Sequence, residues 1–209
     1  MDITYIGHSS FKIRTKSATV ITDPFDPAST GIKFPPQEAD IVTISHDHAD
    51  HNYLEKISGY KKVVAGPGEY EIMGISIIGI STFHDDKEGS ERGKNTIYVY
   101  EAEGLRIVHL GDLGHALSES QIEALGEVDI LMIPVGGVYT IGPKEASDLV
   151  SAVEPYFVIP MHFGGDKLQP LEAFLKEVGQ EGEKMSKFSI KKMYIEENQN
   201  TKVVVLENK

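Results

Sequence analysis

The residues of this chain with the clearest chemical potential lie in one stretch, Ser45 to His51, which reads SHDHADH. Its pattern is H-x-H-x-D-H. Imidazole and carboxylate groups bind Zn²⁺, Mn²⁺ or Fe²⁺ near neutral pH. Crowding them into one turn costs desolvation and mutual repulsion unless a cation lies among them. The stretch therefore predicts a metal site, and a polar loop with surface histidines is the alternative.

Other ligand-type side chains also follow predicted strands. The stretch itself comes directly after an apolar, β-branched run, and His84, Asp112 and His162 each follow a similar run. Because strand ends can converge on one rim of a sheet, we expect these side chains to lie close together. For any single histidine, a hydrogen-bonded structural role is the alternative.

The rest of the chain predicts two packed sheets with helices outside. The first half is rich in strands, and the second half alternates strands with helices. We expect strands over 3–6, 11–14, 19–22, 39–44, 63–65, 70–82 (broken at Gly74 and Gly79), 95–100, 105–110, 129–133, 156–159, 189–196 and 201–207. We expect helices over 53–57, 118–125, 143–153 and 168–178.

The composition is that of a globular protein, and we expect one domain over 1–209. The hydrophobic fraction is 40% and the charged fraction is 25%. The absence of cysteine excludes disulfides and thiolate ligands. No apolar run approaches the ~20 residues of a membrane span, and the first residues lack the pattern of a secretory signal. A cytoplasmic location is the default expectation.

The formal charge of −12 arises from 20 basic and 32 acidic residues. A nucleic-acid backbone or an anionic membrane would repel such a chain at long range. We therefore expect a small-molecule substrate, no nucleic-acid partner and no membrane span. The oligomeric state is left open, a homo-oligomer included.

Several short motifs resemble one known family, the metallo-β-lactamase-fold hydrolases. They are Gly7-His8-Ser9, Asp23-Pro24, Gly111-Asp112, the sequence PVGG at 134–137 and the sequence IPMH at 159–162. The chain is most similar to the branch that contains L-ascorbate-6-phosphate lactonase and N-acyl-phosphatidylethanolamine phospholipase D. The resemblance covers nearly the whole chain. It implies an α/β fold, a four-layer αββα sandwich with a metal site along one edge of the two sheets.

The resemblance also implies a ligand set for two divalent ions. His46, His48 and His84 would hold the first ion, Asp50, His51 and His162 the second, and Asp112 would bridge them. The spacing agrees, because residues two apart in an extended turn point the same way. Histidine-rich sites favour zinc, with manganese or iron as alternatives.

The expected function is that of a binuclear metal hydrolase using a metal-bound hydroxide. The bond cut would be an ester, lactone or phosphodiester of a small substrate, anionic substrates included. Asp112 and Asp50 are expected to act in catalysis. In the family that the chain resembles, antibiotic-hydrolysing members commonly use a cysteine ligand, and di-iron members usually carry glutamate at the position of His48. The resemblance therefore implies hydrolysis of other substrates rather than antibiotic hydrolysis or oxygen chemistry. The alternatives are a non-catalytic metal-binding or sensor protein and a nuclease-like phosphodiesterase.

Five further residues are candidates for supporting roles. His109 and His115 are each a candidate proton donor, substrate contact or rival third ligand to His84. Asp23 is expected to orient a ligating imidazole, or simply to form a turn. His8 reaches the site only if its turn faces the same edge. Arg92 is a candidate clamp for an anionic substrate, and a solvated loop is the alternative.

Overall fold

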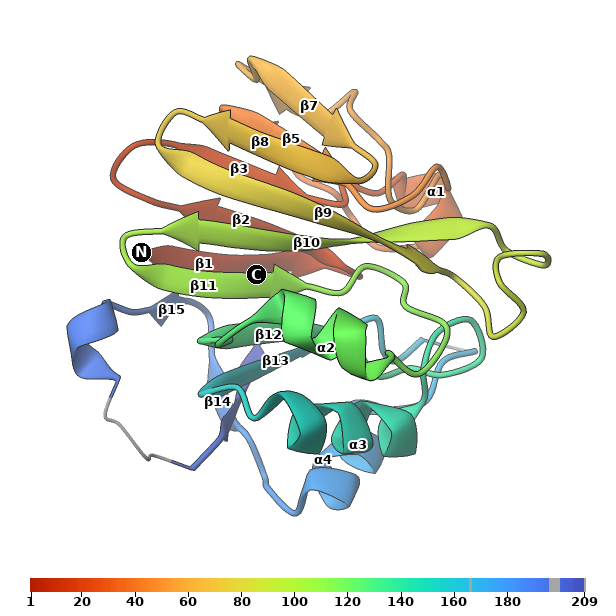
Figure 1. Cartoon of the computed structure of the whole chain (residues 1–209). Helices are drawn as coiled ribbons and strands as arrows, with labels where there is room; N and C mark the ends of the chain where they lie inside the picture. The colour runs from red at the N-terminus through yellow and green to blue at the C-terminus, as the bar shows by residue number, and fades with distance from the viewer. Residues whose placement is uncertain (166, 196–199, 209) are drawn as a thin grey trace.

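Two β-sheets packed face to face form the body of the molecule (Figure 1). The computed structural model describes residues 1–165, 167–195 and 200–208. The smaller sheet has the strand order β15 (Phe188–Ser189), β1 (Asp2–Gly7), β2 (Ser10–Arg14), β3 (Thr19–Thr22), β5 (Ile41–Ile44) and β7 (Lys62–Ala65). The larger sheet has the order β14 (Glu183–Met185), β16 (Lys202–Leu206), β13 (Phe157–Met161), β12 (Ile130–Pro134), β11 (Leu105–His109), β10 (Lys94–Ala102), β9 (Ile75–Phe83) and β8 (Gly68–Ile72). A separate short pair consists of β4 (Gln37–Glu38) and β6 (Ile57–Ser58).

Alternation along the strands builds apolar cores on both faces of each sheet. In β10, Tyr98 and Tyr100 pack between the two sheets, whereas Ile97 and Val99 pack on the opposite face. In β3, Val20 joins the core between the sheets, and the next residue joins a smaller cluster on the outer face. The sheets are therefore held mainly by burial of β-branched and aromatic side chains.

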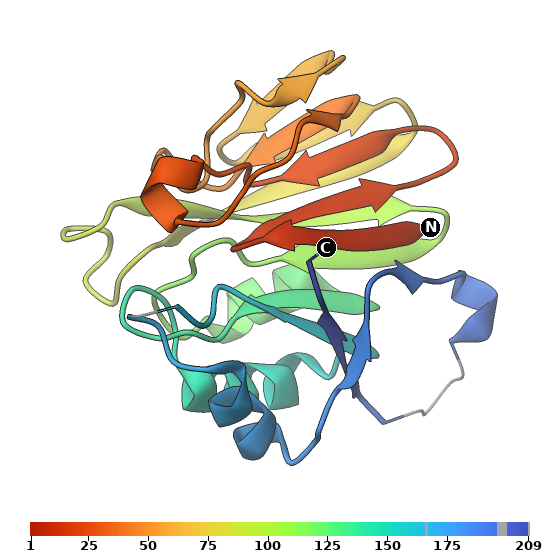
Figure 2. The same ribbon diagram turned by 180° about the vertical axis from the view of Figure 1, so that it is seen from behind.

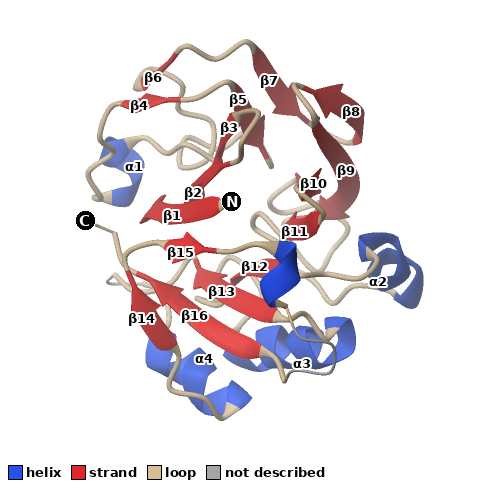
Figure 3. Ribbon diagram, turned by 90° about the vertical axis from the view of Figure 1, so that its left-hand side faces the viewer, coloured by secondary structure: helices blue, strands red, loops and turns tan. Residues whose placement is uncertain are grey.

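The helices lie outside the two sheets, as the sequence predicts (Figure 3). The helices α2 (Glu119–Leu125), α3 (Pro143–Val153) and α4 (Leu171–Val178) cover the larger sheet and bury their apolar side chains against it. On the outer face of the smaller sheet, Phe25 and Phe34 flank the single short helix α1 (Pro27–Thr30). The predicted four-layer sandwich is confirmed, with a thin outer layer on that side. No helix within the described ranges is long and apolar enough to cross a membrane.

The ends of several strands meet at one rim of the sandwich. In the smaller sheet β3 and β5 are parallel, and in the larger sheet β11, β12 and β13 are parallel. Their carboxyl ends therefore lead into loops on the same side. Figure 2 shows these loops and α1 gathered at the end opposite the N-terminus.

One predicted helix, over 53–57, is wrong. This segment is an extended loop with one turn, followed by β6. The N–H of Tyr53 donates to the carbonyl of Pro24, and Ile57 pairs with Gln37. Five residues are too few to nucleate a helix alone, so these tertiary contacts decide the conformation.

Two other predicted elements are shorter than expected. The helix expected over 168–178 begins only at Leu171, since Pro170 disfavours helical backbone in the residue before it. The strand expected over 189–196 ends at Ser189. The pairing continues for one residue, through two hydrogen bonds between Ile190 and Met1, and residues 192–194 then form a turn of 3₁₀ helix instead of extended chain. Residue 196, the last residue of the expected strand, lies outside the described residues.

A buried hydrogen bond across the two sheets leads to a stability prediction. The hydroxyls of Thr43 and Tyr100 lie 2.6 Å apart in the apolar interface. Tyr100→Phe leaves the buried Thr43 hydroxyl unpaired, so the free energy of unfolding should fall by about 1–3 kcal/mol in urea titrations. The matched Thr43→Val/Tyr100→Phe double variant should be closer to the parent protein. An unchanged unfolding midpoint for Tyr100→Phe would contradict this role.

Candidate metal centre

Ligand-type side chains from five loops meet at the rim in overlapping groups. Within each group the donor atoms lie within 4.8 Å of one another. The groups are His46, His48 and His84; His46, His51 and Asp112; and His8, Asp50, His51 and His162. The structure thus brings together every side chain that the sequence predicts as a metal ligand, and His8 lies among them.

The carboxylate of Asp112 lies between the group of His46, His48 and His84 and the group that contains His8. Its Oδ2 is 3.2 Å from Nε2 of His51 and of His162, and 3.4 Å from Nε2 of His84. Donors that share one tetrahedral zinc ion at ~2.0–2.2 Å lie about 3.3 Å apart. Burial raises the pKa of Asp112, but the nearby imidazoles of His162 and His51 outweigh this effect and hold it well below its usual value. An ionised carboxylate in this position can contact an ion on either side.

Asp23 positions two of the predicted ligands, His46 and His51. Its Oδ2 lies 3.0 Å from Nδ1 of His51 and accepts the hydroxyl of Ser45 at 2.6 Å. The Ser45 hydroxyl in turn lies 2.9 Å from Nδ1 of His46. Because that hydroxyl already donates to Asp23, Nδ1 of His46 must carry its proton and donate to Ser45. The same carboxylate therefore leaves Nε2 of both histidines available as a metal ligand.

Nε2 of His46 is buried without a hydrogen-bond partner among the described residues, and the buried Nε2 of His51, although 3.2 Å from Asp112 Oδ2, makes no hydrogen bond of good geometry. A buried polar atom without a partner costs about 1–3 kcal/mol, so the pattern fits a site built for a cation. Burial lowers the pKa of His46 to about 3, which keeps its imidazole neutral and able to coordinate. Burial also lowers the pKa of His51, but the Asp112 and Asp23 carboxylates raise it well above normal. The two carboxylates thus stabilise a positive charge at the position of His51.

Asn95 is a residue that the sequence reasoning missed. Its Oδ1 accepts the N–H of Asp112 at 3.0 Å, and its Nδ2 donates to Thr82 and to the carbonyl of Leu110. The chain bends at Gly111, whose φ is +57°, and a Cβ there would lie 2.3 Å from Oδ1 of Asn95. Asparagine is uncommon within strands, and its place in β10 was the available signal.

The turn after β1 faces the same rim. His8 Nε2 lies 3.2 Å from Oδ2 of Asp50, and the N–H of His162 donates to the His8 carbonyl at 2.9 Å. Burial lowers the pKa of His8, against the opposing effect of Asp50. Beside His162, a Cβ at Gly136 would lie 2.2 Å from the His162 carbonyl oxygen. The PVGG sequence therefore allows close packing under this ligand.

His109 and His115 lie outside the ligand groups, and the backbone engages both ring nitrogens of each. Nε2 of His109 lies 2.8 Å from the Ser9 carbonyl, and its Nδ1 accepts the N–H of Gly111. Nδ1 of His115 lies 2.8 Å from the next residue's carbonyl, and its Nε2 accepts the N–H of Phe83. This geometry favours positioning roles over the proton-donor and ligand roles considered from the sequence.

A pocket of about 770 Å³ opens beside the first group of histidines. His46 and His48 form part of its wall, and the positive charges of Arg92 and Lys94 outnumber the one negative charge of its described lining, that of Asp47. Ile44, Leu54, Ala65 and Pro67 add apolar surface. The guanidinium of Arg92 also lies 4.4 Å from the ring centre of Tyr139. The pocket can therefore hold a small molecule with an anionic group next to the histidines.

The loop that carries Arg92 is organised by one carboxylate, that of Asp85. Asp85 accepts the backbone N–H groups of residues 87, 89, 91 and 92 at 2.7–3.1 Å. Burial raises the pKa of Asp85, but these hydrogen bonds outweigh it and lower the pKa to about 2. The loop is thus an ordered element that holds Arg92 at the pocket.

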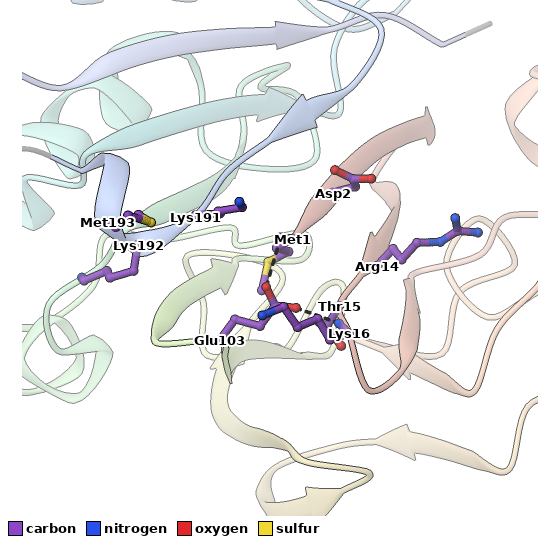
Figure 4. A pocket seen from close by; sticks show the side chains of 9 residues that line it. All are labelled: Met1, Asp2, Arg14, Thr15, Lys16, Glu103, Lys191, Lys192 and Met193. Carbon is purple, nitrogen blue, oxygen red and sulfur yellow. Dashed lines mark hydrogen bonds and ion pairs between the residues drawn. The ribbon is translucent and has the colours of Figure 1, made fainter.

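A second hollow, of about 480 Å³, lies around the N-terminus (Figure 4). There the Met1 ammonium group lies 3.1 Å from Glu103, close to Lys16. None of its described lining residues is a histidine. The length of β1, about 20 Å at ~3.3 Å per residue, separates this hollow from the rim. It is not part of the candidate centre.

Comparisons with known proteins agree with this picture. Residues 2–162 match the family model of the β-lactamase superfamily domain. A Thermotoga maritima crystal structure, described as a Zn-dependent hydrolase of the metallo-β-lactamase superfamily, is 38% identical, with TM-score 0.81 over 100% of this chain and 99% of that one. A Thermococcus onnurineus protein described as a metal-dependent hydrolase is 29% identical over 87% of this chain and 93% of its own length. A Parabacteroides distasonis structure, at 19% identity and TM-score 0.68 over 99% and 93% of the two chains, shows the fold alone.

The position of Asp23 predicts an effect on metal affinity. Asp23→Asn should weaken zinc binding by about 10–100-fold, because His51 loses the carboxylate that orients its imidazole. Ser45, which positions His46, also loses the carboxylate to which it donates. Competition with a chromophoric chelator measures this change. Asp26→Asn, at the half-buried N-cap of α1, is the control and should bind zinc like the parent. Equal affinities for both variants would contradict the role of Asp23.

The pKa of Asp85 predicts a pH-dependent stability difference. A carboxyl with a folded pKa of about 2 against an ordinary 3.8 stabilises the fold above the higher value. That contribution disappears as the pH falls through the folded pKa. In metal-free protein, Asp85→Asn should therefore lower the free energy of unfolding above pH 5, and the difference should shrink between pH 4 and pH 2. Asp86→Asn, at the exposed neighbouring position, should show no such trend in urea titrations.

Proposed function

Since the chain belongs to the metallo-β-lactamase superfamily, we propose that it is a hydrolase that works with two divalent metal ions. The observation that carries the proposal is the position of Asp112 Oδ2, within 3.2–3.4 Å of histidines from both groups. Such a bridging carboxylate has a clear use only where two ions lie side by side.

The side chains present fit this pair of ions. His46, His48 and His84 would hold the first ion, Asp50, His51 and His162 the second, and Asp112 both. The all-histidine first group supports zinc, with manganese or iron as alternatives. When bound, the ions would activate a water molecule and polarise the oxygen of the substrate.

The protein itself contributes positioning and charge. Asp23 and Ser45 orient His46 and His51, and Asn95 holds the backbone of Asp112. Arg92 and Lys94 would bind an anionic group of the substrate, while the apolar wall of the pocket excludes water around it. A small anionic ester, lactone or phosphodiester is the substrate class that this pocket supports best.

We also propose where the chain stands within the superfamily. The motifs Gly7-His8-Ser9 and IPMH at 159–162 support a place near L-ascorbate-6-phosphate lactonase and N-acyl-phosphatidylethanolamine phospholipase D. The single domain over 1–209 and the cytoplasmic location stay predictions from the sequence, which leaves the oligomeric state open.

A panel of small lactones and phosphodiesters, assayed with Zn²⁺ and with Mn²⁺, tests the activity. Asp112→Asn should lower kcat/KM for any substrate found by about 10³-fold or more, since several kcal/mol of transition-state stabilisation depend on the ions. Lys144→Ala is the control, because Lys144 is exposed on α3 and pairs there with Asp148. Metal-loaded protein that turns over none of the panel would favour the non-catalytic alternative. Turnover of oligonucleotides alone would favour the nuclease-like one.

The pocket predicts a separate effect on substrate binding. Arg92→Ala should raise KM for phosphorylated or carboxylated substrates by about 10–100-fold, since hydrogen bonds to charged groups contribute about 1.5–3 kcal/mol. KM for a neutral analogue should hardly change. Lys87→Ala is the matched control, because Lys87 is on the same loop and pairs with Glu91 at the exposed surface. Equal effects on charged and neutral substrates would contradict the clamp.

A further inference from the structure

His8 lies within the ring of donors around the second ion position. Its group consists of His8, Asp50, His51 and His162, with all donor atoms within 4.8 Å. Nε2 of His8 is 3.2 Å from Oδ2 of Asp50. This separation matches the ~3.3 Å between donors that share one tetrahedral ion.

The backbone holds His8 in this place against a local cost. Its φ of 54° is in the left-handed region, which is unfavourable for a residue with a Cβ and is concentrated at functional sites. Its carbonyl accepts the Tyr5 hydroxyl at 2.8 Å and the N–H of His162 at 2.9 Å. Its ring lies 4.4 Å from the ring of His162, centre to centre, and only 10% of the side chain is exposed. The imidazole is thus directed inward and fixed beside a predicted ligand.

We propose that His8 is a ligand of the second metal ion through Nε2, together with Asp50, His51 and His162. This inference rests on the two-ion site of the proposed function. With His8 as a ligand, the two metal positions would have different numbers of side-chain donors. The second would have four side-chain donors besides Asp112, which is typical of a closed site.

The first position would have three histidines besides Asp112, and the substrate pocket borders this group. His46 and His48 line the pocket, whereas no member of the second group does among its described lining residues. Catalytic metal sites keep a position open for substrate or water, and structural sites are closed by protein ligands. The substrate would therefore meet the first ion, and the second would be held mainly by the protein.

The other interpretation of the His8–Asp50 contact is a hydrogen bond that only orients the carboxylate. A direct observation of the metal–nitrogen bond separates the two. The protein is labelled with ¹⁵N-histidine, loaded with ¹¹³Cd²⁺ as the probe, and examined for ¹¹³Cd–¹⁵N couplings by NMR. His8→Gln assigns the His8 signal, and His115→Gln is the control.

The expected result is coupling from His8, His46, His48, His51, His84 and His162. His8→Gln should lose one of these couplings, and His115→Gln should retain them all. Couplings from the other five histidines without His8 would overturn this proposal and leave the two-ion site standing. The absence of any coupling would overturn both. The number of histidines coupled to cadmium is counted in the unsubstituted protein, so a folding defect in the variant does not affect the outcome.

Discussion

The rest of the structure depends on the burial of one carboxylate among imidazoles. Asp112 is almost fully buried, and its Oδ2 lies 3.2–3.4 Å from three histidines on three different loops. An uncompensated buried charge costs several kcal/mol, so these loops can meet only if positive charge is supplied there. Asn95 and the bend at Gly111 hold the carboxylate in place. The position of the Asp112 carboxylate therefore depends on the fold, and the packing of the rim loops depends on how the charge of that carboxylate is compensated.

Several strained backbone positions lie at this same rim. Three residues of the centre, His8, Asp23 and His162, have positive φ without being glycine. Each such conformation costs of order 1–3 kcal/mol and persists only where the surroundings over-determine it. The apolar core between the sheets and the hydrogen bonds of the rim supply that support. A stiff sandwich is thus what allows several irregular loops to present donor atoms with fixed separations.

The charge distribution explains how an acidic chain can accept an anion. The formal charge is −12, but the walls of the candidate pocket carry Arg92 and Lys94 beside the histidines. Asp85 uses its own negative charge to fold the loop that presents Arg92. Bound cations would add further positive charge at the same place. Local geometry, rather than the net charge, therefore decides which ligands this rim favours.

The sequence by itself determined the donor types and the class of fold, because strand periodicity and the H-x-H-x-D-H spacing are local properties. It could not assign Asn95, whose contacts with Asp112 and Thr82 span 17 and 13 residues. It also misjudged 53–57, where contacts with Pro24 and Gln37 outweigh local preference. Only the tertiary structure brought His8 within 3.2 Å of Asp50, 42 residues away. The physical reason is that such contacts form only when the two sheets pack and align their strand ends.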